Sequence, residues 1–136
     1  MKIEHSHPTY QPRVIVGPKE WGPSGWMFLQ SIASAYPDHP TKEEQEDYLR
    51  FFSSVGPVLP CKICRPHYHE YLQTHPLQKA LTSKDALVSY FFHFHNHVNQ
   101  RLGKPQKYRT SLPQFFQKIF PFHSHPKKEE EEGRRK

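Results

Sequence analysis

Large apolar residues recur at intervals of three and four along most of this chain, the spacing that places them on one face of an α-helix. A first helix is predicted from about Ser24 to Tyr36, where Pro37 ends it. A second begins at a capping box over residues 41–44 and ends at the Gly-Pro pair 56–57. The two stripes expected to face the core are Trp26, Leu29, Ala33 and Tyr36, then Tyr48, Phe51, Phe52 and Val55.

The second half of the chain shows three further helical segments. One is predicted from the cysteine pair to about Thr74, because Pro76 lies just beyond it. The longest is capped by residues 82–85 and stopped by Gly103, and a short fifth covers residues 112–120. One face of the longest helix carries Phe91, His95, Val98 and Leu102. Since no segment alternates as a strand does, the fold expected is an all-α four-helix bundle with a short fifth helix.

Composition divides the chain into three parts. Residues 1–20 contain three prolines and few large apolar side chains, which is typical of an N-terminal arm. Residues 21–120 form the helical domain, and residues 121–136 are expected to be a disordered charged tail. No apolar run reaches transmembrane length and the first residues show no signal core, so we expect a soluble chain that does not enter a membrane.

The formal net charge of +6 invites comparison with nucleic-acid-binding proteins. The positive charges are scattered, however, and part of them lie in the tail from Lys127 to Lys136. A solvated surface explains such a distribution better than a nucleic-acid site does. The histidines in the proline-rich ends, at positions 5, 7, 123 and 125, are given no role.

Cys61 and Cys64 are the two cysteines of the chain, and they stand three positions apart. Two cysteines are too few for a secreted disulfide framework, whereas such close spacing is typical of a redox-active pair. Pro60 suits the start of a helix, which would place Cys61 at a helix N-terminus with Lys62 and Arg65 nearby. These effects lower a thiol pKa, so Cys61 is predicted to be the exposed, reactive sulfur and Cys64 to face inward.

Other chemistries also use such a pair. A thioredoxin-like reductase would need a strand before Cys61, and none is predicted. A small helical zinc-binding module could use Cys61, Cys64, His67 and His69. On a helix His67 and His69 point roughly 200° apart, so this zinc site stays open only if the segment is not helical. A third interpretation is a bound flavin as electron relay, for which several helices offer aromatic and polar side chains. These are Trp21, Trp26, Tyr36, His95, Asn96 and Asn99.

Three segments together resemble the Erv/ALR FAD-dependent sulfhydryl oxidases. They are the Trp-Gly-Pro segment 21–26 with its continuation to Pro37, the CxxCxxH segment 60–68, and the HNxVNxxLGKP segment 95–105. CxxC alone is weak evidence, but its combination with the third segment is highly specific. The Trp-Gly-Pro motif and the lack of further cysteines look most like the small forms encoded by large DNA viruses.

The resemblance implies a helical bundle, often a homodimer, that holds FAD at the mouth of its four helices. Cys64 would be the sulfur next to the flavin, and Cys61 the one that meets the substrate. The residues implied to contact the cofactor are Gly22, Trp26, Gln30, Tyr36, Cys64, His67, His95, Asn96, Val98, Asn99, Leu102 and Lys104. Gln30 departs from the family pattern, since cellular members usually have histidine there.

The implied activity is oxidation of protein thiols, with electrons passed to molecular oxygen to give hydrogen peroxide. The chain has no second CxxC, so a substrate must reach Cys61 directly or through a separate thioredoxin-like carrier. The resemblance to viral forms favours the host cell cytoplasm or the virion as compartment. The mitochondrial intermembrane space is the alternative.

Overall fold

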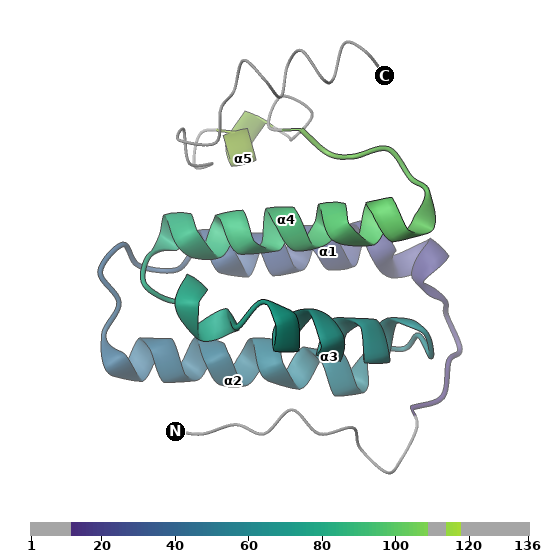
Figure 1. Ribbon diagram of the computed structural model, residues 1–136, viewed down its shortest axis with the longest axis horizontal. Helices are drawn as coiled ribbons and strands as arrows, with labels where there is room; N and C mark the ends of the chain where they lie inside the picture. The colour runs from purple at the N-terminus through teal and green to yellow at the C-terminus, as the bar shows by residue number, and fades with distance from the viewer. Residues whose placement is uncertain (1–11, 109–113, 118–136) are drawn as a thin grey trace.

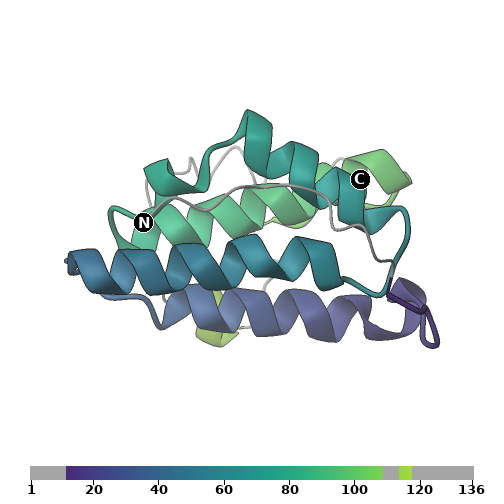
Figure 2. The ribbon, with the colours of Figure 1, turned by 90° about the horizontal axis from the view of Figure 1, so that it is seen from below.

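The computed structural model describes residues 12–108 and 114–117, and all of their regular structure is helical. The elements are α1 (Pro18–Ser34), α2 (Lys42–Val58), α3 (Cys64–Thr74), the 3₁₀ turn η1 (Leu77–Ala80), α4 (Lys84–Leu102) and α5 (Gln114–Gln117). Figures 1 and 2 show α1 to α4 running alongside one another as a bundle. The predicted all-α four-helix bundle is confirmed.

Two helix pairs make up the bundle. α1 packs against α4, and α2 packs against α3 (Figure 1). The core between the pairs is largely aromatic, and Phe52 of α2 lies 4.3 Å from Phe91 of α4 between ring centroids. The largest fully buried side chains are Tyr36, Phe52, Phe91, Leu77, Leu87 and Val88.

The helix ends are fixed by the capping residues that the sequence predicted. Thr41 accepts a hydrogen bond from the Glu44 amide, and Glu44 accepts one from the Thr41 amide. Ser83 caps α4 by accepting from the Ala86 amide. Gly103 ends α4 with φ of 70°, a left-handed conformation that glycine adopts without a steric cost.

Some predicted helix boundaries differ from those observed, and the end of α1, predicted at Tyr36, lies at Ser34. α1 begins at Pro18 and not near Ser24, because proline fits the first helical position, where its missing N–H is not needed. Residues 18–20 therefore form the first turn of α1. α2 continues through Gly56 and Pro57 to Val58, since a proline so close to the end disrupts little of the helix. α3 begins at Cys64, so Cys61 lies in the turn before it.

Two residues of the predicted core stripes point outward. Phe51 is 38% exposed, and Leu102 in the last turn of α4 is 53% exposed. Successive helical residues point about 100° apart, so Phe51 cannot share the inward direction of Phe52. Leu49 is buried on the inward face of α2 instead.

Close contact between α2 and α3 holds the start of α3 in place. The Tyr68 hydroxyl donates to the Phe52 carbonyl at 2.6 Å. The Tyr68 ring lies on Gly56, where an added Cβ would stand 2.6 Å from the ring. Glycine at position 56 is therefore what lets these helices approach so closely.

The described residues include no helix long and apolar enough to cross a bilayer. Part of the predicted fifth helix appears as α5, while the rest of residues 112–120 lies outside the described residues. Residues 1–11 of the predicted arm and the predicted tail at 121–136 also lie outside them.

Candidate redox site

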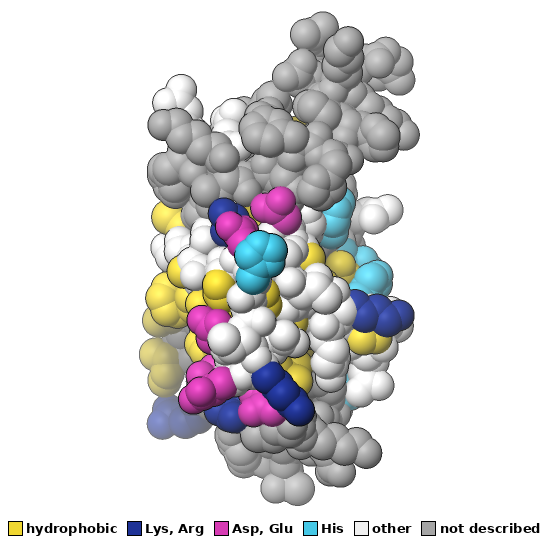
Figure 3. Space-filling model, turned by 90° about the vertical axis from the view of Figure 1, so that its left-hand side faces the viewer, with side chains coloured by type: hydrophobic (Ala, Val, Ile, Leu, Met, Phe, Trp, Pro, Cys, Tyr) yellow, Lys and Arg dark blue, Asp and Glu magenta, His cyan; other side chains and the backbone are white. Residues whose placement is uncertain are grey.

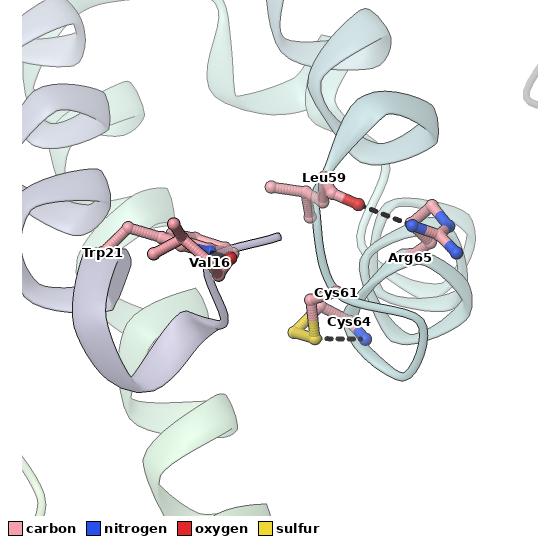
Figure 4. Close-up of a disulfide and its surroundings, with 6 residues drawn as sticks. All are labelled: Val16, Trp21, Leu59, Cys61, Cys64 and Arg65. Carbon is pink, nitrogen blue, oxygen red and sulfur yellow. Dashed lines mark hydrogen bonds between the residues drawn. A yellow bond between two sulfur atoms is a disulfide. The ribbon is translucent and has the colours of Figure 1, made fainter. Parts of the chain in front are cut away.

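Cys61 and Cys64 are joined by a disulfide with an S–S distance of 2.03 Å, in the turn that leads from α2 into α3 (Figure 4). Their Cα atoms lie 5.2 Å apart. The chain thus forms the vicinal sulfur pair that the sequence predicted.

Backbone hydrogen bonds fold the turn around Cys61. The Cys61 amide donates to the Leu59 carbonyl at 2.8 Å, and the Arg65 amide donates to the Cys61 carbonyl at 3.2 Å. The Cys64 amide donates to Cys61 Sγ at 3.1 Å. An N–H at the start of a helix thus points at the Cys61 sulfur, where it would stabilise a thiolate after reduction.

The exposure of the two cysteines is the reverse of the prediction. Cys61 is 8% exposed, whereas Cys64 is half-buried. Figure 4 shows Val16, in the segment that enters α1, and Trp21 of α1 on the side of the turn that faces away from Arg65. The Trp21 indole N–H donates to the Val16 carbonyl at 3.0 Å, which holds this entry segment against α1.

An aromatic stack between α1 and α4 brings two predicted cofactor residues together. The rings of Trp26 and His95 are parallel, with centroids 4.2 Å apart. Burial lowers the pKa of His95 to about 4, and the nearby positive charges of Lys107 and Lys104 act in the same direction. The imidazole is therefore neutral at pH 7.

Asn96 holds the segment that follows α4. Its side chain donates to the Lys107 carbonyl at 2.7 Å and accepts from the Lys107 amide at 2.6 Å. Gln106 donates to the Asn96 carbonyl, and Asn99 donates to the Asn96 side chain. The segment after Gly103 consequently folds back along α4 and brings Lys104 and Lys107 close to His95.

Sequence reasoning missed Gln106 and Lys107. Their contacts with Asn96 depend on the reversal of the chain after Gly103. The signal in the sequence was Gly103 with Pro105 two residues later, but this pattern predicts only where the helix ends.

Tyr36 lies away from this cluster. It follows the C-terminal end of α1, while the disulfide lies beside the N-terminal end of that helix (Figures 1 and 4). Tyr36 is 1% exposed, and its hydroxyl donates to the Leu81 carbonyl at 2.7 Å. Tyr36 is thus a buried residue whose hydroxyl already has a partner, and its predicted cofactor contact stays a prediction.

The other predicted cofactor residues lie on three helices. Gln30 of α1 donates to the Val88 carbonyl of α4 at 3.3 Å. Gly22 is half-buried, and an added Cβ would meet nothing within 4 Å. His67 on α3 and Val98 on α4 are also half-buried, while Leu102 is exposed.

The zinc alternative finds no support in the described residues. Both sulfurs are bonded to each other, and His67 and His69 lie two apart on a regular helix. No group of three or more histidine, cysteine or acidic side chains within the described part of the chain is arranged to hold a metal ion.

A comparison with sequence models of protein families identifies the family of this chain. The sequence model of the Erv1 / Alr family matches residues 23–121, which is well over half of the chain. The chain belongs to the Erv1 / Alr family. The resemblance predicted from its three motifs is thereby confirmed.

Two Erv1 / Alr relatives come from large DNA viruses. The putative FAD-linked sulfhydryl oxidase 096R of invertebrate iridescent virus 3 is 38% identical over 67% of this chain and 62% of its own length. The probable FAD-linked sulfhydryl oxidase R368 of Acanthamoeba polyphaga mimivirus is 40% identical over 65% of this chain and 63% of its own. The chain therefore spans less than two thirds of either relative.

Solved structures of yeast Erv1 share the fold. The FAD binding domain of Erv1 from Saccharomyces cerevisiae has a TM-score of 0.62 and 28% identity, covering 65% of this chain and 83% of that one. The yeast Erv1 core has a TM-score of 0.62 at 24% identity, covering 76% and 84% respectively.

Proposed function

We propose that this chain is an FAD-linked thiol oxidase that generates protein disulfides through its Cys61–Cys64 couple. The observation that supports it most is the disulfide at the start of α3, with the Cys64 amide pointing at Cys61 Sγ. The relatives are named FAD-linked sulfhydryl oxidases, which gives the same chemistry from an independent source.

The side chains near His95 suit FAD as cofactor. Trp26 and His95 offer flat rings for stacking, and Asn96 and Asn99 offer amides for hydrogen bonds. Lys104 and Lys107 bring two positive charges to the same place, as a diphosphate requires. When bound, FAD would accept the electron pair of the reduced couple and pass it to oxygen, giving hydrogen peroxide.

The other predicted contacts stay in the proposal: Gly22, Gln30, Tyr36, Cys64, His67, Val98 and Leu102. The open space at Gly22 and the half-buried position of His67 are compatible with a neighbouring ligand.

The protein's own step is thiol–disulfide exchange. A substrate thiolate forms a bond to Cys61 Sγ, the Cys61–Cys64 bond breaks, and Cys64 leaves as a thiolate. A second substrate thiolate then attacks the substrate sulfur of this mixed disulfide and releases Cys61. The substrate leaves as a disulfide, and both electrons stay on the Cys61–Cys64 dithiol. The Cys64 amide would stabilise the thiolate of Cys61 when it is released.

The proposed partners are a thiol-bearing protein, reached directly or through a thioredoxin-like carrier, and molecular oxygen. A homodimer is proposed as the assembly. Relatives from iridescent virus and mimivirus support the host cell cytoplasm or the virion as compartment. A mitochondrial FAD-linked sulfhydryl oxidase of Schizosaccharomyces pombe, 31% identical, supports the intermembrane space as the alternative.

Oxygen consumption with dithiothreitol tests the activity. The purified chain should consume oxygen and release an equal amount of hydrogen peroxide. Cys64→Ser should do neither, because a single cysteine cannot form the Cys61–Cys64 disulfide that accepts the substrate's electron pair. Equal turnover in the Cys64→Ser variant would show that the couple is not the redox centre.

A further inference from the structure

We propose that Arg65 is a positioning residue for the Cys61–Cys64 couple, and that it acts through the Leu59 carbonyl. The inference deepens the proposed function and rests on its dithiol chemistry. It assigns to Arg65 a task other than the general positive charge that the sequence suggested.

Arg65 is buried, with 7% of its surface exposed. Its Nη1 donates to the Leu59 carbonyl at 2.7 Å, across the turn that contains both cysteines. In Figure 4 this contact runs to Leu59 and not to the sulfur atoms. The ion pairs found in the described residues do not include Arg65. Burying a guanidinium group costs free energy unless its N–H groups donate hydrogen bonds. The hydrogen bond to the Leu59 carbonyl therefore offsets part of the cost of burying Arg65.

The Leu59 carbonyl is the point where the turn is held. It accepts from the Arg65 side chain and also from the Cys61 amide, which lies two residues on across Pro60. The Arg65 amide in turn donates to the Cys61 carbonyl. Arg65 therefore holds the turn on both sides of Cys61, through its side chain and through its backbone.

Such a residue would keep Cys61 next to Cys64 when the pair is reduced. Closing the disulfide is easier when the two sulfurs are already held close together, because less chain entropy is lost. Loss of the Arg65 contact should therefore make the disulfide easier to reduce. Loss of the positive charge alone should instead make the disulfide harder to reduce, because the thiolates of the reduced form would lose electrostatic stabilisation.

Equilibration with glutathione in the absence of oxygen distinguishes these two roles. Each disulfide takes two glutathione thiols and yields the Cys61–Cys64 dithiol and one glutathione disulfide, so the reduced fraction gives an equilibrium constant. Arg65→Met should raise this constant for reduction about tenfold, in keeping with the loss of a hydrogen bond from a charged group. Arg65→Lys keeps the charge on a shorter side chain and should raise it less. Thiol alkylation followed by mass measurement reads the reduced fraction.

Hydrogen exchange and a control variant complete the test. The Cys61 amide should exchange faster in Arg65→Met and in Arg65→Lys, since the turn is held less firmly. Lys62→Met removes an exposed charge from the same turn and should not raise the constant. A lower constant in Arg65→Met, or an unchanged constant and exchange rate in Arg65→Lys, would overturn the proposal. If Arg65→Met does not fold, Arg65→Lys alone decides. Neither readout needs a flavin, so failure of the proposed oxidase activity would be seen separately.

Discussion

Each cysteine of the couple has surroundings that only the folded chain reveals. The spacing of Cys61 and Cys64 predicted their bond, and Pro60 predicted a helix start nearby. The burial of Cys61 was mispredicted, because exposure depends on how the turn before α3 packs in the folded chain, which cysteine spacing alone does not encode.

Serine variants of the two cysteines test which sulfur lies next to the flavin. If Cys64 does, Cys61→Ser should leave a Cys64 thiolate beside oxidised FAD and give a long-wavelength absorbance band. Cys64→Ser is the matched control and should show no such band. A band in Cys64→Ser instead would reverse the proposed roles, which the greater burial of Cys61 makes a necessary check.

His95 gives the fold a defined pH dependence. Its pKa is lowered from 6.5 to about 4 in the folded chain, so between these values the unfolded state binds the proton and the folded state does not. Stability should therefore fall as the pH falls from about 6.5 to 4, and the contribution is fully present above 6.5. A half-buried group limits the effect to about 1–2 kcal/mol.

Urea unfolding between pH 7 and pH 4.5 measures this contribution. His95→Gln should lose less stability over that range than the unaltered chain does. His97→Gln, which changes an exposed histidine on the same helix, should keep the full pH dependence. An identical pH dependence in His95→Gln and the unaltered chain would rule out a role for His95.

At the scale of elements, helix number and capping were predictable because they depend on local residues. The capping box at Thr41 and the glycine stop at Gly103 formed as expected. The start of α1 was not predicted, because a proline can precede a helix or be its first residue. The fold-back after Gly103 was also missed, since it depends on a contact with Asn96.

The close approach of α2 to α3 depends on the absence of a side chain at Gly56. Gly56→Ala should destabilise the fold by about 1–3 kcal/mol, because the added methyl group would overlap the buried Tyr68 ring. Gly22→Ala is a matched control, since an added Cβ there meets nothing within 4 Å. It should leave the stability unchanged or raise it by up to about 1 kcal/mol.

Thermal or urea unfolding of both variants gives the two values. Equal effects at the two positions would show that helix propensity, and not the Tyr68 contact, decides the outcome.

At the scale of the whole molecule, the two helix pairs carry different parts of the proposed site. α2 and α3 carry the sulfur couple, while α1 and α4 carry the Trp26–His95 stack and the lysines that follow it. The end of the bundle opposite the disulfide carries interspersed acidic and basic side chains (Figure 3). The sequence predicted such scattered charge, and the ion pair between Lys84 and Asp38 is part of it.

The absorbance spectrum of the purified chain tests the central claim most directly. An FAD-linked oxidase should be yellow, with a flavin band in the visible range, and denaturation should release about one FAD per chain. Dithiothreitol without oxygen should bleach the band, and air should restore it. A colourless protein that stays colourless after incubation with FAD would contradict the account.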